Sequence, residues 1–325
     1  MKLGILGNGM IVKDLMKTIH KLNFEKIHVL GREASREKVE QLVREHQLTG
    51  SFYDYETMLQ SDVDVIYVAL PNHLHYDFAG KALEHKKHVI LEKPAASSGE
   101  EMRELAELAG NQKRMLFEAM NIHYLPAFQA LKEDLAKLGE IKMVSLNYSQ
   151  YSSRYDAFKQ GTVLPAFDPR MSGGALMDIN VYNVHALMGL FGVPKQARYY
   201  ANVERGIDTS GMMFYDYGTF KAVSIGAKDC RAPIVSTIQG NQAALVIEMP
   251  VNQMTEYRIL YNDGHEELRS FDQTEHRMYY EFAAFIRMIE EDDFETCQKM
   301  LELSCETAEL MTRTRREEGI VFAAD

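Results

Sequence analysis

The chain has 325 residues, of which 46% are hydrophobic and 26% are charged, and its net charge is −11. This length and composition predict a globular protein of two domains, each with enough apolar residues for a core. The acidic balance argues against a nucleic-acid surface and against adhesion to an anionic membrane, because both need a concentrated basic face.

The three cysteines, Cys230, Cys297 and Cys305, follow no pattern. An odd, unpatterned set suits a reducing compartment and offers neither a disulfide framework nor a CxxC metal site. No apolar run reaches the length of a membrane span, and the N-terminus enters a strand pattern at once, so we expect neither a transmembrane segment nor a signal peptide. These features together predict a cytoplasmic protein.

The first part of the chain alternates short apolar runs with longer amphipathic stretches. The apolar runs predict strands at Lys2–Leu6, Lys26–Leu30, Val63–Leu70, His88–Glu92 and Arg114–Glu118. The stretches between them predict helices at Met10–Leu22, Arg36–His46, Tyr76–His85 and Gly99–Ala109. Apolar strands separated by helices indicate a parallel sheet covered on both faces, and right-handed crossovers then give a doubly wound Rossmann fold.

From about Gly139 the pattern changes to successive strands with turns between them. These strands are expected at Ile141–Ser149, Ala197–Val203, Gly211–Phe214, Thr219–Ile225, Val235–Gln239, Ala244–Met249 and Glu256–Tyr261. Strands without intervening helices favour an antiparallel sheet. One long helix interrupts this sheet at Ala175–Phe191, and two more finish the chain near Glu275–Glu291 and Glu295–Glu317.

We therefore predict a dinucleotide-binding Rossmann domain over residues 1–120. A second domain over residues 121–325 combines an open antiparallel sheet with helices. The last two helices of this second domain could pack back on the Rossmann domain.

A glycine loop lies where the first strand turns into the first helix. Gly7 permits the tight turn, and Gly9 lets the backbone approach a pyrophosphate at the helix N-terminus. Val12 stands where the third Gly or Ala of the motif is usual, so a turn without a ligand is the alternative. The place of the loop at the start of an α/β run favours a dinucleotide site. The residues predicted to bind there are Gly7, Asn8, Gly9, Met10 and Ile11.

The second strand ends in Leu30-Gly31-Arg32. An acidic residue at this point would bind the adenosine ribose of NAD, whereas Arg32 favours the 2′-phosphate of NADP. Arg36 could assist this contact, while Glu33 could face the ribose instead. NADP is therefore the predicted cofactor, and NAD is the less favoured alternative.

A lysine stands at the carboxyl end of a buried strand, in Glu92-Lys93-Pro94. In open α/β sheets ligands bind at that edge. A lysine there can polarise a carbonyl or hydroxyl oxygen and help to shift its proton, although a solvated strand end would look the same. Pro94 is a candidate cis-proline.

Three polar residues share one face of the predicted helix Ala175–Phe191: Asp178, Tyr182 and His185. The remaining surface of this helix is mostly apolar, which indicates burial. A polar stripe on a buried helix is either satisfied by partners or faces a cleft. A hydrogen-bonded core network and a catalytic face are both compatible with this pattern.

The motifs taken together resemble one family. The glycine loop, Glu92-Lys93-Pro94, Glu118-Ala119 and Gly173-Gly174-Ala175-Leu176-x-Asp178 resemble those of the Gfo/Idh/MocA oxidoreductases, and the likeness runs to Gly319-Ile320-Val321-Phe322. The resemblance implies a catalytic Lys93 and a C-terminal sheet that carries substrate and subunit contacts, in a homodimer or homotetramer. It also implies further cofactor-binding residues, namely Leu70, Pro71, Asn72, His75, Glu92, Lys93 and Asn121.

The helix motif departs from the commoner family pattern. Many members have Asp-x-Gly-x-His, whereas Tyr182 replaces that histidine here, as in the branch resembling glucose–fructose oxidoreductase and dimeric dihydrodiol/D-xylose dehydrogenase. This branch commonly uses NADP, which agrees with Arg32. His185 falls where many members have Asp. We interpret it as a structural residue or as one that contacts the catalytic residues without touching substrate. His123 stands where many relatives carry Arg, and it is expected to line the cleft.

The resulting hypothesis is reversible hydride transfer between NADP(H) and a hydroxyl- or carbonyl-bearing carbon of a sugar, polyol or cyclic diol. Tyr182 would exchange the proton, Lys93 would stabilise the oxyanion, and Asp178 would orient substrate or lysine. Further substrate contacts could come from Tyr148, Tyr151, Tyr155 and Arg170.

Two other functions remain open. One is a cofactor-binding regulator or redox sensor without turnover, and the other is a glycoside hydrolase that uses tightly held NAD. His73 and His75 resemble a metal pair, but no further ligands support one, so no metal is expected.

Overall fold

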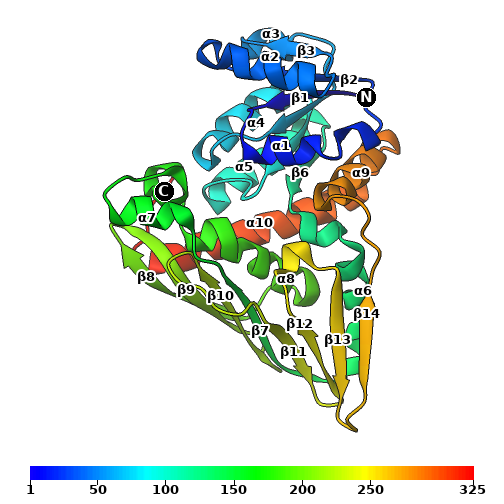
Figure 1. Cartoon of the computed structure of the whole chain (residues 1–325), viewed down its shortest axis with the longest axis vertical. Coiled ribbons are helices and arrows are strands. Elements are labelled where there is room, and N and C mark those ends of the chain that lie inside the picture. The colour runs from blue at the N-terminus through cyan, green and yellow to red at the C-terminus, as the bar shows by residue number, and fades with distance from the viewer. The chain divides into compact units, whose positions relative to one another are not determined.

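The computed structural model describes all residues, 1–325, and divides the chain into two compact units. The first contains Met1–Ala119 and Met278–Cys305, and the second contains Met120–Arg277 and Glu306–Asp325 (Figure 1). None of the helices combines the length and the apolar character needed to cross a membrane.

The first unit is built on a parallel sheet of six strands in the order β3-β2-β1-β4-β5-β6. The order reverses between β1 and β4, and this switch point is where doubly wound sheets bind ligands. The Rossmann prediction is thereby confirmed. The strands are β1 (Lys2–Leu6), β2 (Lys26–Leu30), β3 (Gly50–Phe52), β4 (Val65–Val68), β5 (His88–Glu92) and β6 (Leu116–Ala119).

The helices of this unit differ from the expected ones at two places. The first helix ends at Met16 because Lys17 and Thr18 donate to carbonyls only three residues back, which tightens the turn. The short elements β3 and α3 were not predicted. The helices are α1 (Met10–Met16), α2 (Arg36–Glu45), α3 (Tyr55–Leu59), α4 (His75–Glu84) and α5 (Gly99–Gln112). Short 3₁₀ turns lie at Ile19–Lys21, Glu33–Ser35 and Asn72–Leu74.

Aromatic rings join α9 (Arg277–Glu290) to this sheet. Phe282 packs edge-on against Tyr67 of β4 at 5.1 Å between ring centroids, and Phe285 stacks on Phe117 of β6 at 4.6 Å. The thiol of Cys297, in the first part of α10 (Phe294–Glu317), approaches the Leu116 carbonyl at 3.6 Å. Residues near the end of the chain therefore complete the core of the first unit.

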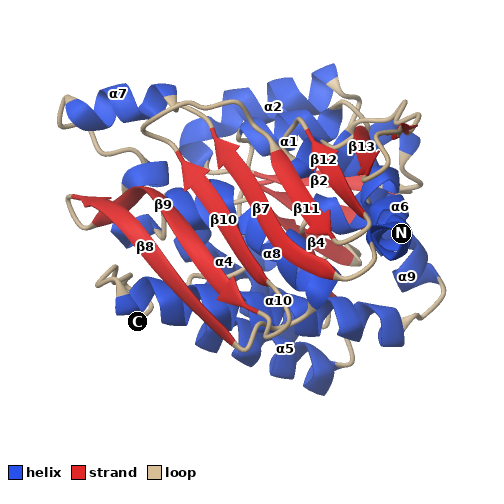
Figure 2. Cartoon of the chain, turned by 90° about the horizontal axis from the view of Figure 1, so that it is seen from below, coloured by secondary structure: helices blue, strands red, loops and turns tan.

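The second unit is built on an eight-stranded sheet in the order β14-β13-β12-β11-β7-β10-β9-β8, much of which Figure 2 shows face-on. Its neighbours are antiparallel except β7 and β10, which run parallel. The purely antiparallel expectation was wrong for this pair, because the long segment between β7 and β10 allows a crossover. The strands are β7 (Ile141–Ser149), β8 (Gln196–Glu204), β9 (Ile207–Asp216), β10 (Lys221–Ala227), β11 (Ser236–Gly240), β12 (Ala243–Ile247), β13 (Glu256–Tyr261) and β14 (Glu266–Ser270).

Helices and short turns join these strands. The helices are α6 (Pro126–Asp134), α7 (Ser153–Lys159), a π-helical turn at Leu176–Asn180 that leads into α8 (Val181–Phe191), and the last part of α10. The 3₁₀ turns lie at Asn121–Tyr124, Leu135–Leu138, Pro165–Phe167, Pro169–Met171 and Val251–Gln253.

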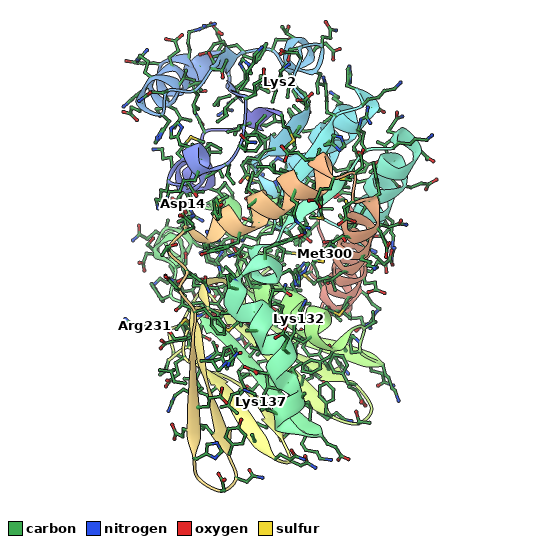
Figure 3. The ribbon with its side chains drawn as sticks, turned by 90° about the vertical axis from the view of Figure 1, so that its right-hand side faces the viewer. Lys2, Asp14, Lys132, Lys137, Arg231 and Met300 are labelled. Carbon is green, nitrogen blue, oxygen red and sulfur yellow. The ribbon has the colours of Figure 1, made fainter.

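A charged network ties α6 to the edge of this sheet. Lys137, just after α6, forms ion pairs at 3.0 Å with Asp134, the last residue of α6, and with Glu267 of β14. The hydroxyl of Tyr257 on β13 donates to Asp134 at 2.6 Å. Figure 3 shows Lys132 and Lys137 along this helix and the turn that follows it. The network fixes one end of the helical layer against the strands.

The start of the π-helical turn is fixed by a glycine and a buried carboxylate. Gly174 has φ +105°, and a Cβ there would overlap Oδ1 of Asp208 on β9. Asp208 accepts hydrogen bonds from the Leu176 N–H at 2.6 Å and from the Tyr199 hydroxyl at 2.8 Å. Burial raises the pKa of Asp208, and these hydrogen bonds oppose that rise. A side chain at position 174 would displace the carboxylate from both donors.

We predict that Gly174→Ala lowers the free energy of unfolding by at least about 2 kcal/mol, since it adds backbone strain and breaks the Asp208 contacts. Gly161 is the matched control, because it has φ +94° with no atom near its missing Cβ. Gly161→Ala should cost only about 1 kcal/mol. Urea unfolding followed by circular dichroism measures both, and equal costs would contradict the role of Asp208.

Candidate functional site

Three loops of the first unit meet at the carboxyl edge of its sheet. Gly7, just after β1, has φ +110°, and a Cβ there would lie 2.6 Å from the Ala69 carbonyl oxygen, just after β4. The Gly7 N–H lies 3.3 Å from the Leu30 carbonyl oxygen, to which it donates. The turn is therefore possible only with glycine. It brings the glycine loop, the predicted residues Leu70 and Pro71, and the end of β2 together.

The glycine loop fits the pyrophosphate of a dinucleotide. No atom lies within 4 Å of the Cβ position of Gly9, so the backbone is open to a ligand there. The helix α1 begins at Met10 with no side-chain cap, and Met10 is 67% exposed. Free N–H groups at a helix start suit phosphate oxygens. Asn8 and Ile11 are partly exposed on either side of this point.

The basic residues after β2 have different partners. Glu33 binds Arg36 through both carboxylate oxygens, at 2.9 and 2.8 Å, and this contact lowers the pKa of Glu33. The Arg36 guanidinium also lies 3.7 Å from the centre of the Tyr53 ring. Arg32 is exposed and has no ion-pair partner. Of the three residues considered from the sequence, Arg32 is the one left open to an anion.

Lys93 follows β5 in a segment held on several sides. Its backbone N–H donates to Oε2 of Glu92 at 3.3 Å, and Glu92 also accepts from the Tyr67 hydroxyl at 2.5 Å. The Lys93–Pro94 peptide bond is cis. The next N–H, that of Ala95, donates to Glu118 of β6 at 3.0 Å. Lys93 is the one residue from 89 to 99 that is not buried, so it is the partly exposed residue of this segment at the end of β5.

His75 joins two of the loops from inside. Its Nε2 lies 2.8 Å from the Leu70 carbonyl oxygen and its Nδ1 lies 3.0 Å from that of Pro94. Burial lowers the pKa of this fully buried imidazole, and its contacts with the backbone carbonyls oppose that shift. His75 can thus act on a cofactor only through the loops it joins. Asn72 begins the short turn that precedes α4 and is partly exposed.

The predicted polar stripe of the second unit divides into two environments. Asp178 lies in the π-helical turn and Tyr182 in α8, so the expected regular four-residue spacing is interrupted. From residue 172 to residue 188 Asp178 alone is not buried. Tyr182 is buried, with its ring centroid 6.1 Å from that of Tyr148.

His185 points into the core of the second unit. Its Nδ1 lies 3.3 Å from Nε2 of the buried His123, whose pKa is lowered well below its usual value by burial and then by His185. Asn121 is also buried and donates to the Asn252 carbonyl at 2.8 Å. These residues form a core network, which is one of the two alternatives that the sequence left open.

A buried lysine that the sequence analysis missed contacts Asp178. Lys228, directly after β10, forms an ion pair with Oδ2 of Asp178 and donates to the Ala166 carbonyl at 3.2 Å. The alternation along β10 could have revealed it. Ala222, Ser224 and Gly226 are buried, and a period of two places residue 228 on the same face.

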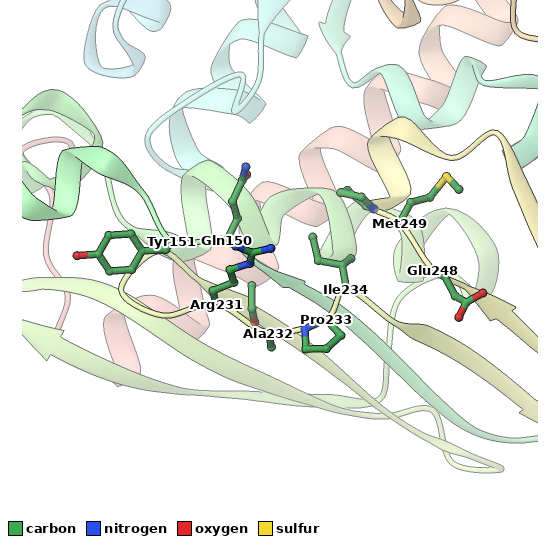
Figure 4. Close-up of a pocket in the computed structure, with 10 residues that line it drawn as sticks. Gln150, Tyr151, Arg231, Ala232, Pro233, Ile234, Glu248 and Met249 are labelled. Atoms are coloured by element: carbon green, nitrogen blue, oxygen red, sulfur yellow. The ribbon is translucent and has the colours of Figure 1, made fainter.

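A cavity of about 900 Å³ opens beside the end of β7 (Figure 4). Its size is within the range usual for small-molecule sites, about 300 to 1,000 Å³. The sequence had indicated no pocket here. Its walls come from the loops after β7, β10 and β12, and are Ser149, Gln150, Tyr151, Arg231, Ala232, Pro233, Ile234, Glu248, Met249 and Pro250.

The other predicted substrate contacts are engaged within the second unit. Tyr155 donates to Glu204 at 2.6 Å, and Arg170 pairs with Asp168 at 2.8 Å. Tyr151 lines the cavity and donates to Asp156 at 2.6 Å. No group of three or more His, Cys, Asp and Glu side chains is arranged to hold a metal ion.

Comparisons with known proteins relate this architecture to a family. Residues 1–120 match the model described as "Oxidoreductase family, NAD-binding Rossmann fold". The chain is 35% identical to scyllo-inositol 2-dehydrogenase (NADP(+)) IolU of Bacillus subtilis, covering 100% of this chain and 99% of that protein. It is 28% identical to D-xylose 1-dehydrogenase (NADP(+)) 2 of Haloferax volcanii, covering 89% of each.

A solved structure shares the fold. KijD10, a 3-ketoreductase from Actinomadura kijaniata in complex with NADP and TDP-benzene, superimposes with a TM-score of 0.80 at 20% identity over 97% of each chain. Together with the full-length identity to the Bacillus protein, these findings show that the chain belongs to the Gfo/Idh/MocA oxidoreductase family.

Proposed function

We propose that the protein is an NADP-dependent dehydrogenase acting on a hydroxyl-bearing carbon of a sugar, polyol or cyclic diol. The observation that carries this proposal is the presentation of Lys93 at the carboxyl edge of the parallel sheet, on a segment that His75 joins to the loop after β4. The names of the relatives support the substrate class, because they act on scyllo-inositol and D-xylose with NADP(+).

The cofactor assignment rests on the glycine loop and on Arg32. The loop Gly7–Ile11 would hold the pyrophosphate through backbone N–H groups, and the unpaired Arg32 would bind the 2′-phosphate. Leu70, Pro71, Asn72, Glu92 and Asn121 stay predicted contacts. When bound, the nicotinamide supplies or accepts the hydride.

Three side chains of the chain would handle the substrate oxygen and its proton. The Lys93 ammonium would donate to the oxygen and stabilise the negative charge that develops on it. The Tyr182 hydroxyl would give or take the proton, and its burial would limit exchange with water. Asp178 would orient the substrate by accepting a hydrogen bond. The assignment of all three to one reaction rests on their sequence motifs.

Removing the Lys93 charge tests the proposed chemistry. We predict that Lys93→Met lowers kcat by at least about 1,000-fold, because the hydrogen bond and the positive charge that stabilise the developing oxyanion are lost. NADPH affinity, measured by fluorescence titration, should stay within about threefold, since the glycine loop and Arg32 are unchanged. Lys299→Met, which removes an exposed lysine paired with Glu295, is the control. Retained turnover in Lys93→Met would remove Lys93 from the reaction.

Reversing the charge after β2 tests the cofactor. We predict that Arg32→Asp raises the KM for NADP at least tenfold, about the value of one charge-assisted phosphate contact, and leaves the KM for NAD equal or lower. Steady-state kinetics with both cofactors give the ratio. Arg44→Asp, on the last turn of α2, is the control. An unchanged NADP/NAD ratio in Arg32→Asp would refute the 2′-phosphate assignment.

We also propose a homo-oligomer in the cytoplasm. Tyr200 of β8 lies opposite Met212 of β9, and Phe214 follows on the same face, so three exposed apolar side chains form a patch. Met143 and Leu268 continue this face on β7 and β14. Large exposed apolar patches often mark protein interfaces. No disulfide bond joins any of the three cysteines, which is compatible with a reducing compartment.

The double substitution Met212→Asp with Phe214→Asp is expected to dissociate the oligomer, because it places charges in the apolar interface. Light scattering coupled to size-exclusion chromatography measures the mass. Val321→Asp, at an exposed apolar residue outside the sheet, should leave the mass unchanged. If the double variant keeps the mass of the wild type, the sheet face is not the interface.

A further inference from the structure

Lys228 carries a charge that solvent cannot reach. Its side chain is 3% exposed, whereas that of its partner Asp178 is 38% exposed. The ammonium group also donates to the Ala166 carbonyl and lies 4.6 Å from the centre of the Phe167 ring. Burying an ammonium group without a counter-charge is strongly unfavourable. A buried Lys228 therefore needs the ion pair with Asp178. The pair presents only its carboxylate to a ligand.

The backbone fixes the point from which this side chain extends. The Lys228 N–H donates to the Thr209 carbonyl at 2.9 Å, and the Lys228 carbonyl accepts from Ser152 at 2.9 Å. The backbone of residue 228 is thus hydrogen-bonded to a neighbouring segment on each side and extends β10 by one residue. The position from which the side chain extends is therefore fixed by backbone hydrogen bonds.

The helix that carries Asp178 is bonded to the same strand. Asn183 of α8 donates to the Ile225 carbonyl of β10 at 3.1 Å. A Cβ on Gly226 would lie 2.5 Å from that of Asn180, so glycine permits the close approach of helix and strand. The carboxylate and the ammonium thus stand on two elements that are attached to each other. Their mutual geometry is set before any ligand binds.

We propose that Lys228 is a positioning residue that keeps the Asp178 carboxylate ionised and oriented as a hydrogen-bond acceptor for a substrate hydroxyl. The inference rests on the proposed dehydrogenase function. It deepens that function, because an ionised Asp178 can accept but not donate. A substrate must then offer a hydroxyl proton to it, as a polyol or diol does besides its reacting group. Lys228 itself touches no substrate.

The charge of Lys228 also acts on Asp208. Asp208 of β9 is buried beside the first turn of the helix, and the charge of Lys228 is among the influences that oppose the rise of its pKa. Tyr182 follows Asp178 on the helix. Loss of the lysine charge therefore acts on Asp178 and Asp208 together, and a test must separate the two carboxylates.

Three variants separate charge, hydrogen bonding and shape at position 228. Lys228→Met removes both charge and donor, Lys228→Gln keeps a donor without charge, and Lys228→Arg keeps the charge. Lys221→Met is the matched control, because Lys221 begins the same strand and pairs at 2.9 Å with Asp216. Assignment of the Asp178 carboxyl carbon by ¹³C NMR uses Asp178→Asn, and Asp208→Asn identifies the second carboxylate.

We expect Lys228→Met and Lys228→Gln to lower kcat/KM for scyllo-inositol and NADP by at least about 30-fold, while Lys228→Arg recovers most of the loss and Lys221→Met stays within about twofold. The acid limb of the pH profile should move to higher pH in the two neutral variants, by at least about one unit. The direction follows because the ionised carboxylate loses its cation. The NMR titration of Asp178 should move in the same direction.

Other outcomes would overturn the proposal. If the neutral variants keep the pH profile and the Asp178 titration of the wild type and lose only thermal stability, the pair is merely a structural link. The same conclusion follows if Lys228→Gln retains full kcat/KM. If the wild type turns over no polyol but the Asp178 titration still shifts in Lys228→Met, the dehydrogenase function fails while the electrostatic hold on Asp178 stands.

Discussion

A buried charge has to be paired, and in the second unit this constraint organises the region around Asp178. The Lys228 ammonium, on the residue directly after β10, forms an ion pair with Asp178 near the start of the helix. It also donates a hydrogen bond to the Ala166 carbonyl. Lys228 is buried, so the Asp178 carboxylate is the only group of this ion pair that solvent or a ligand can reach. The glycine at position 226 and the side chain of Asn183 bring the helix close enough to the strand for this pairing. The start of the same helix is also held by Asp208, which accepts a hydrogen bond from the Leu176 N–H.

In the first unit, backbone contacts have the corresponding role. Gly7 can follow β1 so closely only because it has no side chain to meet the Ala69 carbonyl. The imidazole of His75 then contacts both the loop after β4 and the segment of Lys93, and Glu118 accepts a hydrogen bond from Ala95 beyond it. Lys93 is presented by a scaffold whose polar atoms are already bonded to each other. The segment that carries Lys93 is thus fixed by hydrogen bonds of the residues on either side of it.

Much of this organisation could be predicted from the sequence, and the failures have local causes. The strands β1, β2, β5, β7 and β13 begin and end at the predicted residues, because their apolar runs are bounded by clear turn residues. The strand β14 was missed because it is polar and lies at a sheet edge, and β3 is too short for a pattern. The π-helical turn and the burial of Lys228 depend on how the helix packs against β10. The spacing of residues along the sequence does not reveal this packing. The cavity at Ser149–Tyr151 was missed because its walls come from three distant loops.

The proposed reaction is the transfer of a hydride between NADP and a sugar-like substrate. The most direct measurement is the nicotinamide absorbance of the purified protein with NADP or NAD and a panel of inositols, sugars, polyols and dihydrodiols. We predict reduction of exchangeable NADP by at least one polyol or diol, with a lower kcat/KM when NAD replaces NADP. Tight NADP binding without reduction by any of these substrates would contradict it and would favour a sensor without turnover.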